Sequence, residues 1–392
     1  MVGEQSAVEA AGFDAARLDA IEAMLQGLVD AGRMPGAVAL VMRHDAVAMF
    51  GAIGVQDPST QAPMRRDSIF RIFSMTKPIV SVAAMRLVED GRLLLTDPVA
   101  KHLPEFADVR VQVERDGASA LEPPKRPMTV QDLLRHTAGF TYEFFEPSAV
   151  RRLYAEAGIA SLDRGIVEHL RLLASLPLMH EPGSAWYYSR ATDVLGGLVE
   201  KLTGETLGAH LRRTIFDPLG MVDTGFHVAP EHATRIAEPF PIDPESGAAV
   251  RLGDARRPRR LESGGGGLQS TAADYARFLR MLLAGGSLDG VRLLGPKTVE
   301  FMTADHLGTI PNVCPELPAG YGFGLGFAVK LATGVTPVPG SIGTYGWGGI
   351  AGTLFFVDPK ERLIALLMFQ APGQRPAIQE RFRNMVYAAI AR

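Results

Sequence analysis

A serine and a lysine lie three positions apart in the segment Arg71–Pro78, which reads Arg-Ile-Phe-Ser-Met-Thr-Lys-Pro. A mostly apolar run, Ile79–Val88, follows, so the pattern predicts a buried helix that begins close to Ser74. Residues three apart share a helix face, which points Ser74 and Lys77 the same way. Burial lowers the pKa of a lysine, and a serine beside such a lysine is one arrangement for nucleophilic catalysis. The alternative without a catalytic role is a helix-capping serine with a solvated lysine.

A pair of tyrosines precedes a second predicted helix, in the segment Pro182–Arg190. A tyrosine near a positive charge releases its proton more readily, so Tyr188 is a candidate general base beside Lys77. The pair Tyr187 and Tyr188 also fits an ordinary half-buried aromatic contact. The choice of base between Tyr188 and Lys77 stays open, because two coupled groups titrate as a pair.

Glycines are dense in a third segment, Gly343–Gly352, just before a predicted strand. Such a segment lets a ligand approach the backbone at a sheet edge, and a free N–H there suits one half of an oxyanion hole. A bulge at a strand end is the alternative. Another glycine run, Ser263–Gly267, lacks the accompanying lysine of a phosphate-binding loop, so we predict close backbone packing instead.

The elements that position these segments follow from hydrophobic periodicity. A helix is predicted after Asp14, and strands are predicted at Ala37–Met42, Val47–Gly51, Tyr321–Leu331, Thr353–Val357 and Leu363–Gln370, before a terminal helix at Ile378–Ile390. Helices are expected in the middle of the chain, at Val130–Arg135, Ile166–Leu176, Asp193–Leu202, Leu207–Ile215 and Ala272–Leu283. Long connections there include Ala118–Pro127 and Pro230–Arg260.

This order of elements predicts an α/β plus all-α fold class. An antiparallel sheet flanked by the terminal helices is expected from residues 1–70 and 296–392, a discontinuous α/β domain. Residues 71–295 are expected to form a mainly helical inserted domain, with the active site in the cleft between the two.

The composition excludes several classes of function. The chain has 47% hydrophobic and 21% charged residues and a formal net charge of -3, which gives no reason to expect nucleic acid or an anionic membrane as partner. Cys314 is the only cysteine, so no disulfide within the chain is expected. Met1–Gln5 lack the basic and then apolar pattern of a signal peptide, and no apolar run is long enough to span a membrane. A cytoplasmic protein is therefore expected. None of the nine histidines has zinc-like spacing, and we expect no metal and no cofactor. The oligomeric state is not predicted.

The three segments together resemble the serine hydrolases of the class C β-lactamase and penicillin-binding-protein superfamily, and most closely its esterase branch, the family VIII carboxylesterases. The similarity runs over nearly the whole chain, with supporting segments at Leu133–Gly139, Asp193–Gly196, Gly266–Asp274 and Tyr321–Gly326. The resemblance implies a β-lactamase/transpeptidase-like fold, which agrees with the split sheet predicted above.

The resemblance also implies roles for individual residues. Ser74 matches the acylated nucleophile, Lys77 the lysine of Ser-x-x-Lys, and Tyr188 the tyrosine of Tyr-x-Asn. The backbone N–H groups of Ser74 and Ile350 match the oxyanion hole. Substrate-binding positions are implied for Tyr142, in a loop that lines the pocket of the esterases, and for Trp347, Gly348 and Gly349, which stand where lactamases carry Lys-Thr-Gly.

Two positions depart from the lactamase pattern. Arg190 replaces the asparagine of Tyr-x-Asn, and Trp347 replaces the lysine of Lys-Thr-Gly. An indole removes a charge-assisted hydrogen bond and adds apolar contact area, so short-chain, apolar acyl esters are the expected substrates. The expected reaction is ester hydrolysis through an acyl-serine, in which Lys77 lowers the pKa of Tyr188. The chain has no Gly-x-Ser-x-Gly sequence, which excludes an α/β-hydrolase esterase.

Other interpretations stay open. β-Lactam hydrolysis, D-amino-acid peptide hydrolysis and acyl transfer use the same fold and the same acyl-enzyme. A ligand-binding protein without turnover is the alternative outside enzymes. Such proteins typically lose one of Ser74, Lys77 and Tyr188, and all three are present here.

Overall fold

The computed structural model describes Val8, residues 10–115 and residues 118–391. None of the helices in these ranges is both long enough and apolar enough to cross a membrane. The expectation about a signal peptide concerns Met1–Gln5, which lie outside the described residues.

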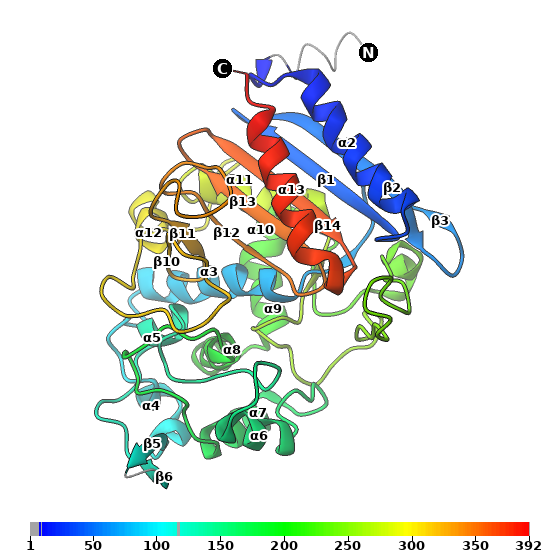
Figure 1. Cartoon of the computed structure of the whole chain (residues 1–392). Coiled ribbons are helices and arrows are strands. Elements are labelled where there is room, and N and C mark those ends of the chain that lie inside the picture. Colours follow the sequence, from blue (N-terminus) through cyan, green and yellow to red (C-terminus); the bar gives the residue numbers. More distant parts are fainter. Residues whose placement is uncertain (1–7, 9, 116–117, 392) are drawn as a thin grey trace.

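An antiparallel sheet lies behind the two terminal helices in Figure 1. Within the described residues it has eight strands in the order β10-β11-β12-β13-β14-β1-β2-β3. They are Gly36–Arg43 (β1), Ala46–Asp57 (β2), Ala62–Pro63 (β3), Tyr321–Phe323 (β10), Ala328–Lys330 (β11), Tyr345–Gly348 (β12), Leu354–Asp358 (β13) and Leu363–Phe369 (β14). β1 pairs with β14 from Ala37 opposite Phe369 to Arg43 opposite Leu363. Strands from opposite ends of the sequence therefore meet inside the sheet.

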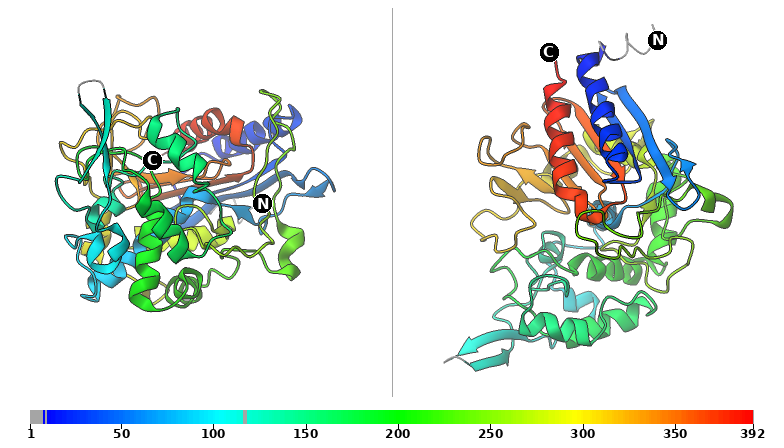
Figure 2. Two further views of the ribbon diagram at one scale, coloured as in Figure 1. Left: turned by 90° about the horizontal axis from the view of Figure 1, so that it is seen from below. Right: turned by 45° about the vertical axis from the view of Figure 1, so that its right-hand side comes forward.

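Alternate residues of β1 enter two separate cores. Ala37, Ala39 and Val41 pack with helices α2 (Ala15–Asp30) and α13 (Arg375–Ala388), which Figures 1 and 2 show side by side on one face. Val38 and Leu40 point the other way, into the larger core that contains helices α3 (Thr76–Glu89) and α11 (Ala272–Leu283). The two-residue alternation is that of a strand, and burial on both faces explains why β1 reads as an unbroken apolar run.

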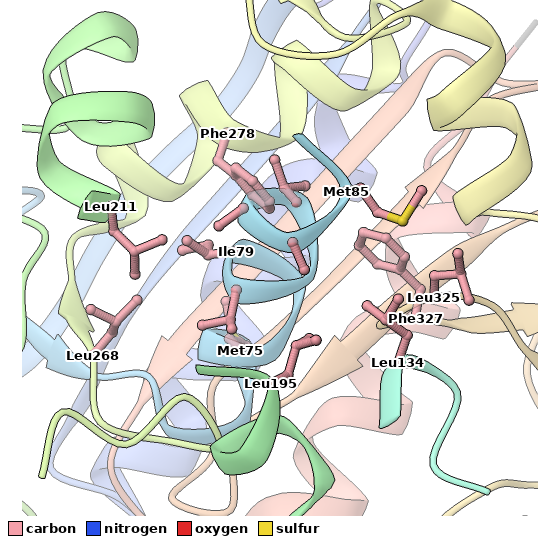
Figure 3. Packing of buried hydrophobic residues seen from close by; sticks show 14 of the residues in the cluster. Met75, Ile79, Met85, Leu134, Leu195, Leu211, Leu268, Phe278, Leu325 and Phe327 are labelled. Carbon is pink, nitrogen blue, oxygen red and sulfur yellow. The ribbon is translucent and has the colours of Figure 1, made fainter. Parts of the chain in front are cut away.

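Helix α3 lies within the larger core, surrounded by side chains from distant parts of the chain. Figure 3 shows Met75, Ile79 and Met85 of this region near Leu195, Leu268, Phe278 and Phe327. Its residues from Thr76 to Met85 are all buried. Because the helix is packed on every side, its N-terminus is held in a fixed relation to both the sheet and the other helices.

Most of the remaining elements are short. The helices are Val99–His102 (α4), Val130–Leu134 (α5), Ala149–Glu156 (α6), Ile166–Ser175 (α7), Ala191–Thr203 (α8), Leu207–Leu211 (α9), Asp217–Leu219 (α10) and Pro296–Met302 (α12). Three small two-stranded sheets pair Phe70–Arg71 (β4) with Gln269–Ser270 (β7), Val111–Arg115 (β5) with Ala118–Glu122 (β6), and Ser287–Leu288 (β8) with Val291–Arg292 (β9).

Comparison with the predicted elements shows agreement and several differences. The single strand predicted over Tyr321–Leu331 is wrong, because the chain turns at residues 324–327 and forms two antiparallel strands, β10 and β11. α11 has the predicted bounds, Ala272–Leu283. The predicted connection Ala118–Pro127 is wrong in its first half, because Ala118–Glu122 is strand β6. Helix α6 was not predicted, and the helix predicted over Leu207–Ile215 leaves α-helical geometry after Leu211 in a π-helical turn. α11 packs against β1 and β14 although it belongs to the predicted helical insertion, and the domain boundaries themselves stay a prediction.

Candidate active site

A cavity of about 640 Å³ lies where the sheet meets the helical part of the chain. Its walls include Ser74 from the turn before α3, Tyr142 from the loop before α6, and Tyr188 from the loop before α8. Trp347 of β12 and Ile350, just after it, complete the group. The fold thus brings together residues from segments up to about 270 positions apart in the sequence.

Ser74 lies in a single 3₁₀ turn, Phe73–Met75, that leads directly into α3. The residue before it, Phe73, has a positive φ of 43°, a conformation that bulky non-glycine residues adopt rarely. The Tyr275 hydroxyl donates a hydrogen bond to the Met75 carbonyl at 2.8 Å and holds the turn from the side of α11. The predicted helix start close to Ser74 is confirmed.

Lys77 lies in the first turn of α3 and is only 1% exposed. Its Nζ is 2.7 Å from the Gly265 carbonyl oxygen, 3.0 Å from the Tyr142 hydroxyl and 3.3 Å from Ser74 Oγ. Burial lowers the pKa of Lys77 to about 7, although the nearby carboxylate of Asp193 acts in the opposite direction. A large part of the Lys77 population is therefore neutral near pH 7, with Ser74 in reach.

Tyr188 is buried above the same nitrogen, with Lys77 Nζ 4.5 Å from the centre of its ring. Its hydroxyl accepts a hydrogen bond from Trp347 Nε1 at 3.1 Å and also interacts with the Ser74 hydroxyl. Burial nevertheless raises the pKa of Tyr188 above that of a free phenol, more than these hydrogen bonds lower it. The expectation that Lys77 acidifies Tyr188 is wrong, because Lys77 lies over the ring and is itself depleted of charge.

Tyr142 contacts Lys77 in addition to lining the cavity. It is 7% exposed, and its hydroxyl accepts the hydrogen bond from Lys77 Nζ. Its ring stacks on Phe144, with centroids 4.7 Å apart, and lies 5.4 Å from the ring of Tyr188. The sequence placed Tyr142 in the pocket, but the bond to Lys77 was not predicted.

Trp347 and Gly348 form the end of β12, and Gly349 follows directly. β12 lies between β11 and β13 and is thus not an edge strand. A Cβ on Gly349 would lie 2.6 Å from the Ile72 carbonyl oxygen, so only glycine lets β12 approach the chain before Ser74 this closely. Gly348 and Trp347 line the cavity, whereas Gly349 packs behind it.

Ile350 offers the second predicted oxyanion donor. It is 43% exposed at the cavity wall, and no acceptor for its N–H is present among the described residues. Gly349 N–H, by contrast, is bonded to the Thr353 carbonyl at 2.7 Å. Ile350 therefore lies at the cavity wall with a backbone N–H that has no partner among the described residues, which is compatible with the role that the resemblance implies for it.

The glycine run before α11 packs closely against its neighbours, as predicted. A Cβ on Gly264 would lie 2.5 Å from the Thr192 carbonyl oxygen, and one on Gly267 would lie 2.8 Å from the Phe226 ring. Gly265 supplies the carbonyl that accepts from Lys77. The close packing was predicted from the glycines, whereas the hydrogen bond from Lys77 to Gly265 was not.

Three charged residues beside the site form a group that the sequence reasoning missed. Arg190 donates two hydrogen bonds to the Glu143 carboxylate, from Nε at 3.1 Å and from Nη2 at 2.6 Å. The Asp193 carboxylate lies 3.5 Å from Arg190 Nη1 and accepts from Gly265 N–H at 2.9 Å. The signals for this group were Arg190 in place of the usual asparagine and the acidic Glu143 inside the aromatic loop Phe140–Phe145. Among the described residues, no cluster of three or more histidine, cysteine, aspartate or glutamate side chains is arranged to hold a metal ion.

Comparisons with known proteins agree with this geometry. The β-lactamase family model matches residues 21–389. The chain is 36% identical to the esterase EstB of Burkholderia gladioli over 397 residues, covering 95% of each protein. It is 36% identical to protein Rv1367c of Mycobacterium tuberculosis over 365 residues, covering 90% of each.

One of the similar solved structures is EstCE1, described as a hydrolase with promiscuous acyltransferase activity. It has a TM-score of 0.79 and 28% identity, and the match covers 100% of both chains. The predicted β-lactamase/transpeptidase-like fold with its antiparallel sheet is thereby confirmed. The chain belongs to the β-lactamase family and, as its motifs predicted, to the family VIII carboxylesterase branch.

Proposed function

We propose that this protein is a serine carboxylesterase that hydrolyses short-chain, apolar acyl esters through an acyl-serine intermediate. The observation that carries the proposal is the Ser74 hydroxyl 3.3 Å from the nitrogen of a buried lysine whose pKa is about 7. The esterase EstB, which is similar over nearly the full chain, and the hydrolase EstCE1 support the same class of reaction.

Neutral Lys77 is the general base in this mechanism. Its amine has two N–H bonds, which the Gly265 carbonyl and the Tyr142 hydroxyl accept. Its lone pair is then directed toward the third neighbour, Ser74 Oγ. Tyr188 is a weaker candidate because its raised pKa leaves little phenolate near neutral pH. Its hydroxyl instead donates a hydrogen bond to Ser74 Oγ and so stabilises the negative charge that develops there.

The reaction proceeds in two halves. The Ser74 oxygen attacks the ester carbonyl as its proton passes to Lys77, and the tetrahedral oxyanion accepts hydrogen bonds from the N–H groups of Ser74 and Ile350. Each such donor contributes roughly 3 kcal/mol to transition-state stabilisation. The ester C–O bond then breaks, and the Lys77 ammonium returns the proton to the departing alcohol. A water molecule releases the acid by the same steps, with Lys77 again accepting and returning one proton.

The walls of the cavity favour an apolar acyl group. Trp347 stands where the lactamases have a lysine, and the Tyr142, Phe144 and Tyr188 rings line the wall near Ser74. Arg190, at the place of the lactamase asparagine, is bound to Glu143 and Asp193. The site thus lacks two polar groups on which lactam recognition depends, and esters are the preferred substrates.

Replacement of Ser74 tests the proposal. Ser74→Ala is expected to lower kcat for p-nitrophenyl butyrate by about 10,000-fold, because the acyl-enzyme no longer forms. Ser81→Ala is the matched control, since Ser81 is a buried serine on the same helix and does not line the cavity. Mass spectrometry after a fluorophosphonate should find the label on Ser74. Undiminished turnover in Ser74→Ala, or an unlabelled Ser74, would contradict the proposal and favour a binding protein.

Acyl transfer to an alcohol is the second candidate, on the ground of the EstCE1 description and a cavity of about 640 Å³ around the serine. Product analysis with added 1-butanol separates butyl butyrate from butyric acid. Nitrocefin in the same assays measures any β-lactamase activity. The cytoplasmic location also stays a proposal, which fractionation of the source cells tests.

A further inference from the structure

Arg190 occupies the position of the lactamase asparagine and lines the cavity, yet its guanidinium is bound to carboxylates of the protein. The guanidinium forms a two-point ion pair with Glu143 and a third contact with Asp193, and its side chain is only 8% exposed. Most of its N–H donors are therefore used inside the protein. An arginine held in this way acts on its neighbours instead of on a ligand.

One neighbour is the segment Tyr142–Glu143. The edge of the Arg190 guanidinium binds the Glu143 carboxylate, while its carbon lies 5.1 Å from the centre of the Tyr142 ring. Two successive residues of the aromatic loop are thus held by the edge and the face of one planar group. In this position the Tyr142 hydroxyl lies 3.0 Å from Lys77 Nζ.

The other neighbour is Asp193, which connects Arg190 to the glycine run. Asp193 Oδ1 accepts hydrogen bonds from Gly265 N–H at 2.9 Å and from Ser263 Oγ at 2.6 Å. Its Oδ2 faces Arg190. The Gly265 carbonyl in turn accepts from Lys77 at 2.7 Å. Two of the three neighbours of Lys77 Nζ are therefore fixed by partners of Arg190.

We propose that Arg190 is a positioning residue that, through Glu143 and Asp193, holds Tyr142 and Gly265 against Lys77 and so aligns the base with Ser74. This inference rests on the proposed esterase function, since it concerns the same lysine. Glu143 is then the partner that fixes the orientation of the Arg190 guanidinium. The ion pairs of Arg190 also explain why the site stays ordered without the asparagine of the lactamases.

The charge of Arg190 gives this role a signature that simple packing lacks. The charged groups near Lys77 are Asp193, Arg190 and Glu316, and the titratable groups that pack around it are Tyr142, Tyr188 and His136. Removal of Arg190 leaves Asp193 and Glu143 unneutralised, so protonated Lys77 is favoured and its pKa rises. Removal of the Glu143 charge has the opposite sign.

The experiment measures pH profiles of Arg190→Met and Glu143→Gln on p-nitrophenyl butyrate. Arg190→Met should lower kcat by about 10- to 100-fold, because displacement of a catalytic group by about 1 Å has effects of this size, while KM changes by less than about threefold. The acid limb of kcat/KM should move to higher pH in Arg190→Met and to lower pH in Glu143→Gln. Arg190→Lys keeps the positive charge but loses the planar group that binds a carboxylate at two points. It should leave the acid limb of kcat/KM at the same pH and lower kcat.

Arg235→Met is the matched control. Arg235 forms a comparable two-point ion pair with Asp223, at 2.7 and 2.6 Å, with both side chains mostly buried and outside the cavity lining. It should lose stability without change in the acid limb. If the wild type shows no turnover that depends on Ser74, the esterase function fails.

Even if the wild type is inactive, a crystal structure of Arg190→Met tests the positioning role. Displacement of the Tyr142 hydroxyl from Lys77 supports this role, and an unchanged contact overturns it. In an active wild type, the inference is overturned if Arg190→Met and Glu143→Gln keep kcat within twofold, or if their acid limbs move the same way. Should Arg190→Met fail to fold, Glu143→Gln and Arg190→Lys carry the same test.

Discussion

Two lysines of this protein are almost completely buried, and only one has the surroundings of a catalytic group. Lys77 and Lys330 are each 1% exposed, and burial lowers the pKa of both. Lys330 lies on β11, where its Nζ donates to the Val338 carbonyl at 2.7 Å. Lys77 Nζ lies beside a carbonyl and two hydroxyl groups, one of which belongs to Ser74.

The difference shows that burial alone does not create a base. Loss of solvent weakens the charge of either ammonium group. A neutral amine becomes useful only where its lone pair meets a hydroxyl that has to lose a proton. At Lys330 the nearby opposite charge is Asp358, which is already bonded to Thr344 and Tyr387, and the residue is a structural link between strand and loop.

Replacement of each lysine by methionine should give the largest difference between the two regions. Lys77→Met is expected to lower kcat/KM for p-nitrophenyl butyrate by about 10,000-fold, because Ser74 loses its base. Lys330→Met should keep kcat/KM within about threefold and lower Tm instead, since the Val338 carbonyl loses its donor. Steady-state kinetics and thermal unfolding measure both effects. Similar losses of activity in the two variants would remove the distinction.

The pH dependence of the wild type sharpens the comparison. Lys77 accepts a proton only when neutral, and its pKa is lowered to about 7. Below that pH, kcat/KM should fall about tenfold per pH unit, and above it the profile should be level. A Tyr188 phenolate as base would instead make the rate rise through pH 9, because the pKa of Tyr188 is raised. Rates from pH 5.5 to 9.5, corrected for spontaneous ester hydrolysis, distinguish the two.

The smallest expected effect concerns Trp347. Its indole N–H donates a hydrogen bond to the Tyr188 hydroxyl beside Lys77. Trp347→Phe keeps an aromatic ring against Tyr188 and removes the Nε1 donor to its hydroxyl. We expect kcat to fall by about 3- to 10-fold, the effect of one hydrogen bond. Trp186→Phe is the control, since no partner for the Trp186 indole N–H is present in the described part of the chain. Equal kinetics of Trp347→Phe and the wild type would refute the role of this bond.

Local patterns were sufficient for much of the fold and for part of the site. Ser74 and Lys77 lie three positions apart at the start of one helix, so their spacing alone predicted a common direction. The apolar runs of β1, β13 and β14 predicted the sheet. The hairpin β5–β6 was missed although Asp116–Gly117, a strong turn signal, separates its strands in the sequence.

The direct partners of Lys77 could not be predicted in the same way. Tyr142 and Gly265 are 65 and 188 positions away, and their contact depends on how the aromatic loop and the glycine run fold around α3. The wrong expectation for Tyr188 has the same origin. A tyrosine near a lysine is acidified only if the lysine is charged, and the degree of burial that decides this is a property of the finished core.

The pairing of β1 with β14 has a consequence for how the protein is made on the ribosome. β1 ends at Arg43 and its partner begins at Leu363, so about 320 residues are synthesised between them. At the usual rate of translation this takes roughly 15 to 65 s. During this time the edge of β1 that later pairs with β14 has no partner strand. An unpaired strand edge can pair with other chains, so raised chaperone levels should increase the yield of native enzyme during expression.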